Sequence, residues 1–232
     1  MVFDIKTLLL VNFIVNFLSA FSMGVILYQF HKLFSGLHVI LYSIILSVMG
    51  IGLILLRSFI PGFFGIVIAN TLLIAGLLVL LIGLEQFIGK RGPQIHNYLL
   101  LTTYFILVSY FYLIESSLVM REIILVSVTI LLDVQICLLL FHRTPKSLLP
   151  VVRIVGLVMG CHLFFSIFIL VAEIFFPFAS TNFFSAGLIG ELIVIGYLLL
   201  NIWTIIALVM MVTRRLLGEV QAQEEKFTKA YH

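Results

Sequence analysis

Two ionisable side chains, Asp133 and His162, lie deep inside apolar stretches of the sequence, where charged groups are costly and usually face other protein groups. Asp133 lies nine residues before His142, and His162 lies nine residues after Arg153. On two helices joined by a short loop, both side chains would sit about 13–14 Å from the membrane surface. The pair could respond to its surroundings or form a polar pocket with the nearby Gln135. Alternatively, it only holds two helices together through a hydrogen bond, which is the interpretation that the sequence favours.

A second group of charged residues is predicted near one membrane surface. It comprises Glu115, Glu122, Glu173, Glu191, Arg57 and Arg121. Such an acidic mouth could bind a cation or an amine, but we adopt the simpler interpretation that these residues mark helix ends in water. Asn70, Asn201 and Trp203 add polar groups to the third and seventh predicted helices, as interhelical hydrogen bonds or as ligand contacts. The candidate ligand-binding residues are Asp133, His162, Gln135, Asn70, Glu191 and Trp203.

The sequence contains no recognisable catalytic motif and no metal-binding pattern. His31, His38, His96 and His142 fall at predicted helix ends and only His162 lies deep, so no two histidines are placed to hold a haem inside the membrane. We find no nucleophile–base motif, phosphate-binding loop or paired catalytic carboxylates. The chain itself is therefore expected not to be an enzyme and to bind no cofactor, metal or nucleic acid.

Hydropathy predicts the elements that position these residues. With 63% hydrophobic and 10% charged residues and a mean hydropathy of +1.29, the 232-residue chain is too apolar to fold in water. Apolar stretches of membrane-spanning length follow one another with short connections, which predicts an all-α bundle of seven transmembrane helices over residues 1–212. The predicted spans are 6–28, 39–56, 62–88, 97–114, 122–141, 153–176 and 184–212.

The basic residues predict the orientation of this bundle. If the C-terminus is cytoplasmic, ten of the 13 lysines and arginines lie on the cytoplasmic side, and Lys6, Arg57 and Arg121 lie outside. Because cytoplasmic loops are enriched in lysine and arginine, the N-terminus is predicted to be outside and the C-terminus inside.

Small residues repeat along the third predicted span. Gly62, Gly65, Ala69, Gly76 and Gly83 are separated by three, four, seven and seven residues, which places them on one face of a helix. This face predicts close packing against a neighbouring helix rather than glycines that face lipid by chance.

Residues 213–232 change to an amphipathic, charged segment. Side chains recur there every seven residues in a weak heptad pattern, as Thr213, Val220 and Phe227 and as Leu217, Glu224 and Tyr231. The pattern predicts a linker helix that continues the seventh helix into the cytoplasm and pairs with a second copy of the chain. The predicted transmission residues are Arg214, Arg215, Leu217, Val220 and Phe227.

Two stretches resemble parts of bacterial signalling proteins. Residues 224–232, EEKFTKAYH, resemble the segment that opens a PAS domain. Residues 68–89 resemble the third helix of the multi-helix modules that precede PAS and GGDEF (diguanylate cyclase) or histidine kinase domains. The resemblance implies a dimeric sensory module of the bacterial inner membrane that passes a conformational change through its seventh helix to a PAS domain absent from this sequence.

Two other classes of function stay open at this point. A small transporter or channel predicts a polar path through the membrane and activity without any output domain. A haem-binding membrane protein, the less favoured alternative, predicts a strong visible absorption band. For the sensory module, the expected partners are the lipid bilayer, a second copy of the chain and a small or apolar ligand.

Overall fold

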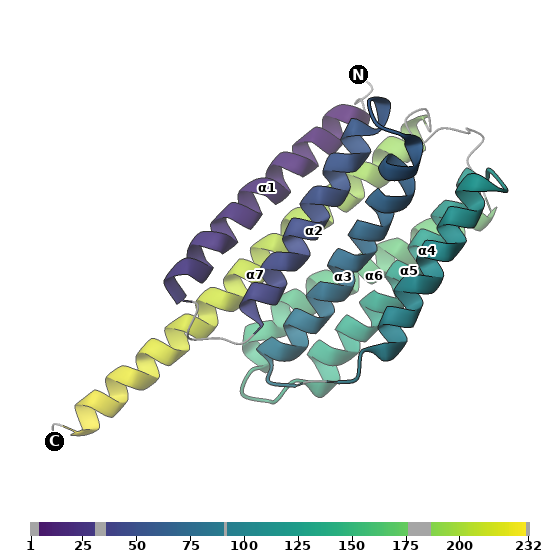
Figure 1. Ribbon diagram of the computed structural model, residues 1–232. Helices are drawn as coiled ribbons and strands as arrows, with labels where there is room; N and C mark the ends of the chain where they lie inside the picture. The colour runs from purple at the N-terminus through teal and green to yellow at the C-terminus, as the bar shows by residue number, and fades with distance from the viewer. Residues whose placement is uncertain (1–4, 31–35, 91, 176–186, 231–232) are drawn as a thin grey trace.

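The structure is a computed structural model that describes residues 5–30, 36–90, 92–175 and 187–230. Every regular element in this part of the chain is helical, and seven long α-helices lie roughly alongside one another (Figure 1). They are α1 (Ile5–Phe30), α2 (Leu37–Leu55), α3 (Ala69–Phe87), α4 (Ile95–Leu113), α5 (Leu118–Leu138), α6 (Leu149–Phe175) and α7 (Gly187–Ala230). Three short elements extend them, namely η1 (Leu56–Ser58) after α2, η2 (Phe64–Ile68) before α3 and η3 (Leu139–Arg143) after α5.

Six of these helices are long and apolar enough to cross a membrane, so the chain is a multi-pass membrane protein. The exception among the described helices is α4, which carries four tyrosines together with His96 and Asn97 in its 19 residues. Each predicted span overlaps one observed helix, which confirms the all-helical architecture. A membrane-spanning role for α4, and the orientation of the bundle, stay predictions.

The helices close into a ring. Contacts join α1 to α2, α2 to α3, α3 to α5, α5 to α6, α6 to α7 and α7 back to α1. We call these six helices the helix ring. α4 lies outside it and packs against α5 and α3 (Figure 1). The six helices of the ring are the same six whose hydropathy suits a membrane span.

Three of the five small residues predicted to share a packing face, Ala69, Gly76 and Gly83, pack directly against α2. Of the other two, Gly65 contacts Arg57 of η1, and Gly62 contacts Tyr112 of α4. A Cβ atom added to Gly83 would lie 2.8 Å from Ile40 Cγ1, and one added to Gly76 would lie 2.9 Å from Ser47 Oγ. Ala69, on the same face, has no exposed surface. Glycine at these positions therefore lets the two helix backbones approach closely.

An apolar core fills the bundle at the end where α7 leaves it, which we call the exit end. α3 ends and α6 begins at this end. The core there includes Leu84, Phe87, Ile136, Leu140, Val152, Val155 and Met211, none of which exposes more than 1% of its surface. At the opposite end, a smaller cluster joins Ile5, Leu8 and Leu9 of α1 to Val194 of α7.

α7 is continuous over 44 residues and extends alone beyond the rest of the bundle (Figure 1). Two arginines fix it at the exit end. The Arg215 guanidinium donates to the backbone oxygen of Phe87 at the end of α3 and lies 4.6 Å from the centre of the Phe87 ring. Arg214 Nη1 donates to the backbone oxygen of Pro150 at the start of α6, over 3.2 Å. Both arginines therefore bind α7 to its neighbours just where it leaves them.

Candidate functional site

A cavity of about 340 Å³ lies inside the helix ring. All six ring helices contribute to its wall, whereas α4 contributes none of the lining residues. The lining extends from Arg57 and Glu173 near the end opposite the exit end to Leu80 and Leu208 toward the exit end. A cavity of this size between helices of a bundle is typical of a binding site for a small molecule.

Four charged side chains line the cavity at the end opposite the exit end. They are Arg57, Arg121, Glu122 and Glu173, and their formal charges cancel. Arg121 is almost fully buried, its Nε donates to the backbone oxygen of Ser117 over 3.1 Å, and its guanidinium lies 5.8 Å from the ring centre of Tyr112. Glu122 is within electrostatic range of Arg57 and Arg121.

Glu173 is the least satisfied member of this charged group. Only 3% of its surface is exposed, and its Oε2 atom has no hydrogen-bond partner among the described residues. Its charged neighbours include Glu122, which carries the same sign. A buried carboxylate oxygen without a donor is costly, so this atom is where the cavity has unmet hydrogen-bonding capacity.

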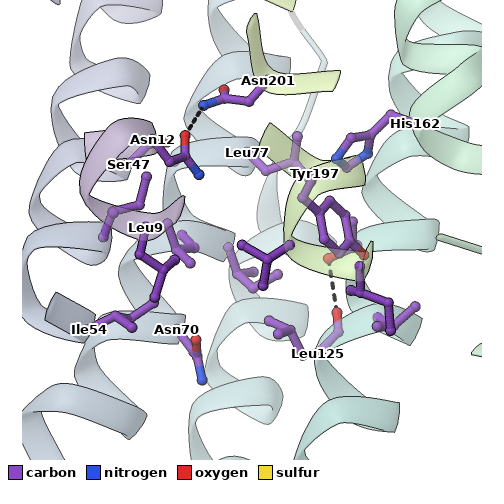
Figure 2. Close-up of a pocket in the computed structure, with 18 of the residues that line it drawn as sticks. Leu9, Asn12, Ser47, Ile54, Asn70, Leu77, Leu125, His162, Tyr197 and Asn201 are labelled. Carbon is purple, nitrogen blue, oxygen red and sulfur yellow. Dashed lines mark hydrogen bonds between the residues drawn. The ribbon is translucent and has the colours of Figure 1, made fainter. Parts of the chain in front are cut away.

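Asparagine side chains join the first and last helices of the ring beside the cavity. Asn16 Nδ2 of α1 donates to Asn12 Oδ1 over 2.8 Å, and Asn201 Nδ2 of α7 donates to the same oxygen over 2.8 Å. Figure 2 shows the side chains of Asn12 and Asn201 pointing toward each other, joined by this hydrogen bond. Hydrogen bonds of this kind hold membrane helices together where apolar contacts alone give little preference for one neighbour.

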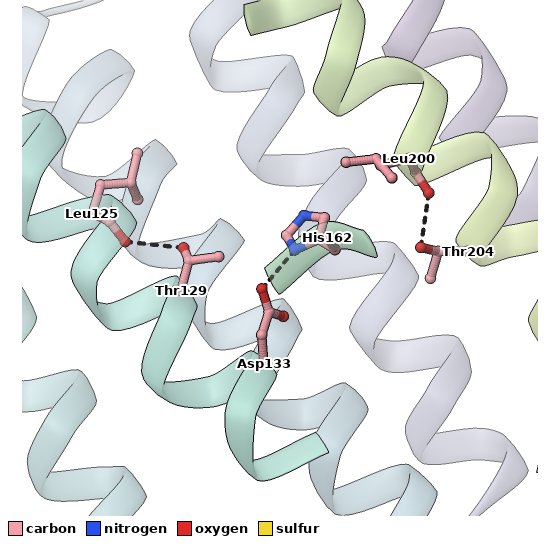
Figure 3. Close-up of polar contacts among 6 residues, drawn as sticks. All are labelled: Leu125, Thr129, Asp133, His162, Leu200 and Thr204. Atoms are coloured by element: carbon pink, nitrogen blue, oxygen red, sulfur yellow. Dashed lines mark hydrogen bonds and ion pairs between the residues drawn. The ribbon is translucent and has the colours of Figure 1, made fainter. Parts of the chain in front are cut away.

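Asp133 and His162 form the pair that the sequence predicts. His162 Nδ1 lies 2.6 Å from Asp133 Oδ2, and Figure 3 shows the carboxylate of α5 pointing at the imidazole of α6. Asp133 has no exposed surface and does not line the cavity, whereas His162 does, with its ring centre 5.5 Å from that of Tyr197. Asp133 therefore orients a cavity-lining imidazole from behind. Whether the pair is functional or structural stays a prediction.

The other candidate residues occupy different places. Asn70 lines the cavity, whereas Glu191 is buried without lining it. Trp203 is 59% exposed and lies outside the cavity, so the site described here does not include it.

Gln135, which one interpretation of the sequence placed in a polar pocket with Asp133, contacts α4 instead. Gln135 Nε2 donates to Asn97 Oδ1 of α4 over 2.9 Å, and its Oε1 lies 3.3 Å from Nε2 of His96. The physical reason is helix geometry, because residues two positions apart point in nearly opposite directions around a helix. Asp133 thus faces α6 while Gln135 faces α4.

Several polar residues of the cavity were not among the candidates. Tyr197 and Thr204 of α7 and Asn12 and Asn16 of α1 all line it, together with Asn201, which the sequence indicated only as a polar residue of the seventh span. The spacings of four and three residues on α7, and of four on α1, place each set on one helix face. A search for polar stripes on otherwise apolar helices would have found both sets.

Comparisons with known proteins identify no relative of this chain. No family model, curated protein or solved structure matches it. Among the described residues, no group of three or more His, Cys, Asp or Glu side chains is placed to hold a metal ion. The candidate site is therefore defined by its geometry alone, as a partly charged cavity enclosed by six helices.

Proposed function

We propose that this protein is a membrane sensory module in which occupancy of the central cavity moves α7. The observation that supports this proposal is that α7 both lines the cavity and extends out of the bundle. α7 lines the cavity through Tyr197, Asn201 and Thr204, and it continues without interruption past Arg215 to Ala230. A molecule that binds in the cavity therefore touches the element that leaves the bundle.

The contacts of α7 suggest how binding would act. A ligand can shift a conformational equilibrium only if it binds two arrangements with different affinity. Within the ring, Asn201 ties α7 to Asn12, and at the exit end Arg214 and Arg215 tie it to α6 and α3. A rotation or translation of α7 would exchange these hydrogen bonds together, which favours two discrete arrangements over a continuous range.

The proposal includes a signalling enzyme that α7 would control. By the resemblance noted above, the module would act in the bacterial inner membrane as a homodimer, upstream of a diguanylate cyclase or a histidine kinase. Leu217 and Val220 are 58% and 54% exposed on the projecting helix, which suits pairing with a second copy. The side chain of Phe227, the third predicted contact, lies outside the described residues.

A transporter or channel is the rival proposal, and the charged cavity end favours it. Arg57, Arg121, Glu122 and Glu173 would suit the entry of a polar solute. Against this, the apolar core at the exit end separates the cavity from the other side of the bundle. A transporter would have to part that core during each cycle, whereas a sensor needs only a small shift of α7.

A chimera tests the sensory proposal. The chain is joined through α7, in heptad register, to the dimeric catalytic core of a histidine kinase. Thr204→Phe places an aromatic ring at the cavity wall, whereas Ile206→Phe, on the same helix, adds it to a residue that is 45% exposed. We expect Thr204→Phe to change autophosphorylation by at least about fivefold, the lower end of usual allosteric coupling. The Ile206→Phe control should leave it unchanged.

The outcome that contradicts the sensory proposal is equally specific. If both variants fold, as judged by size-exclusion chromatography, and kinase output is the same in each, the cavity is not coupled to α7. Solute uptake by vesicles that contain only this chain would then support transport.

A further inference from the structure

We propose that the charged end of the cavity binds a small organic amine, with the Glu173 carboxylate as the partner of its ammonium group. This inference deepens the proposed function by naming the ligand class. It rests on that function only for the consequence of binding, because the chemistry of the site can be tested separately.

The cavity contains a buried hydrogen-bond acceptor that lacks a donor. Glu173 is 97% buried, lines the cavity and has no donor for Oε2 among the described residues. In a site shielded from water, such an oxygen gains most from a donor that also carries positive charge. An ammonium group supplies both the charge and up to three N–H donors.

The charges around this acceptor favour a cationic ligand over an anionic one. Arg57 and Arg121 lie at the same end of the cavity, and both are within electrostatic range of Glu122. Arg121 Nε already donates to the backbone oxygen of Ser117, and its guanidinium lies beside the ring of Tyr112. Glu122 adds a second carboxylate within electrostatic range of Glu173. An anion would have to approach both carboxylates, whereas an ammonium group would complement Glu173 Oε2, which has no partner in the described part of the chain.

A bare metal ion is not the favoured cation at this site. Calcium and magnesium prefer six or more oxygen ligands or several retained waters. The described residues offer no cluster of three or more carboxylate, imidazole or thiol groups at this place. An organic cation needs fewer fixed ligands, since it brings its own N–H groups and an apolar body.

The rest of the cavity suits that apolar body. Ile54, Ile66, Ile169, Ile193 and Val194 line it together with the charged group. Burial of apolar surface against them would favour an amine that carries an aromatic or branched aliphatic group. A volume of about 340 Å³ accommodates a compact molecule of this kind.

Binding of three matched probes tests the proposal. The purified full chain is placed in nanodiscs of phosphatidylcholine, which has no net charge, and binding to empty nanodiscs is subtracted. The probes are 2-phenylethylamine, 2-phenylethanol and 3-phenylpropionate, which share an aromatic body and differ in the charge of the polar group. We expect the amine to bind at least about tenfold more tightly than the alcohol, since a hydrogen bond between charged groups is worth that factor or more. The propionate should bind most weakly.

Two variants assign the preference to one carboxylate. Glu173→Gln keeps the size of the side chain and should bring the affinities for amine and alcohol within about twofold of each other. Glu115→Gln changes an exposed glutamate that does not line the cavity, and it should leave the tenfold preference intact. Equal affinities for amine and alcohol in the unaltered chain would overturn the proposal, and so would a full preference in Glu173→Gln. Because the probe comparison uses the unaltered chain, it decides the question even if a variant does not fold.

The result is separable from the test of signalling. Amine binding without any effect of Thr204→Phe on kinase output would leave the amine site in place and reject the sensory function. An effect of Thr204→Phe without any preference for the amine would keep the sensory function and reject this ligand class.

Discussion

Asp133 is a carboxylate with no exposed surface in the middle of a membrane helix, and its environment determines what it can do. One oxygen lies 2.6 Å from His162 Nδ1, and the other has no hydrogen-bond partner among the described residues. Taking charges out of water is expensive, and close pairing recovers only part of that cost. Removal of one partner of this pair is therefore expected to destabilise the protein far more than removal of both partners.

We expect a double-mutant cycle to show this asymmetry. His162→Leu leaves the Asp133 carboxylate buried without its partner and should lower the free energy of unfolding by about 3 kcal/mol. In the double variant Asp133→Leu with His162→Leu, no charge remains to be paired, and most of that loss should be recovered. Unfolding in mixed micelles by titration with dodecyl sulfate measures both values. Equal losses in the single and double variants would show that packing, and not the charge pair, governs this site.

The same pair bears on signalling. Asp133→Asn keeps the shape of the side chain, so in the kinase chimera it separates the two interpretations of this contact. Altered output with unchanged stability would favour a functional pair, and unaltered output would favour a structural one.

At the scale of elements, α2 and α3 pack closely because glycines remove side chains from their interface. An added Cβ at Gly83 would lie 3.0 Å from the Ile40 backbone nitrogen as well as 2.8 Å from its side chain. Backbone atoms cannot turn away as a flexible side chain can. A larger residue there would have to separate the two helices.

Substitution of these glycines should therefore destabilise the bundle in a position-specific way. We expect Gly83→Leu to lower the midpoint of thermal unfolding and the free energy of unfolding by about 1–3 kcal/mol, as overpacking usually does. Gly160→Leu on α6 is the matched control, because an added Cβ there meets no atom within 4 Å. Similar destabilisation by both substitutions would indicate that helix propensity or lipid contact, and not α2–α3 packing, accounts for the effect.

α4 is held to the outside of the ring by an apolar face, which includes the buried Tyr104 and Val108, and by a chain of polar contacts. Gln94 Nε2 donates to Glu85 Oε2 of α3 over 2.6 Å, and Asn97 Nδ2 donates to Gln94 Oε1 over 2.7 Å. Gln135 Nε2 of α5 completes the connection by donating to Asn97 Oδ1. This continuous hydrogen-bonded path satisfies the amide of Asn97, which is almost fully buried.

At the scale of the whole molecule, seven helices would place the two ends of the chain on opposite sides of the membrane, and Figure 1 draws them at opposite ends of the bundle. The distribution of basic residues predicts that the exit end is cytoplasmic. Exposed positions at the two ends make this testable. Ser116 follows α4 at the end opposite the exit end, and Ser147 precedes α6 at the exit end.

We expect a membrane-impermeant maleimide to label Ser116→Cys in intact cells and Ser147→Cys only after the cells are opened. Both variants are made in a background in which Cys137 and Cys161 are replaced by alanine, since the native thiols would also react. The reverse pattern would show an inverted bundle. Labelling of both sites in intact cells would show that α5, which separates them in the chain, does not cross the membrane.

Much of this fold was accessible from the sequence. Apolar stretches broken by polar clusters located the helices, because in a bilayer each backbone group must be satisfied within its own helix. Gly76 and Gly83 correctly indicated a close helix contact, since their spacing is a local property of one helix. The ring itself was not predictable, because which helix packs beside which depends on the shapes of surfaces far apart in the sequence.

The site was predicted only in part, for the same reason. Asp133 and His162 could be paired because a short loop fixes the relative height of α5 and α6. Asn12 and Asn201 are 189 residues apart, and no local pattern announces that α1 and α7 meet. Glu173 was assigned to a solvated helix end, whereas it is buried and lines a cavity between helices that are far apart in the sequence.

The meeting of α1 and α7 has a consequence for biosynthesis. The wall of the cavity is incomplete until α7 has entered the membrane, because this last helix supplies Tyr197, Asn201 and Thr204 and closes the ring against the first. During translation, the earlier helices lie in the bilayer while Asn12 Oδ1 lacks its hydrogen bond from Asn201. A molecule that fills the finished cavity would stabilise only fully inserted chains, and it would thereby protect newly made protein from the proteases that remove incomplete bundles.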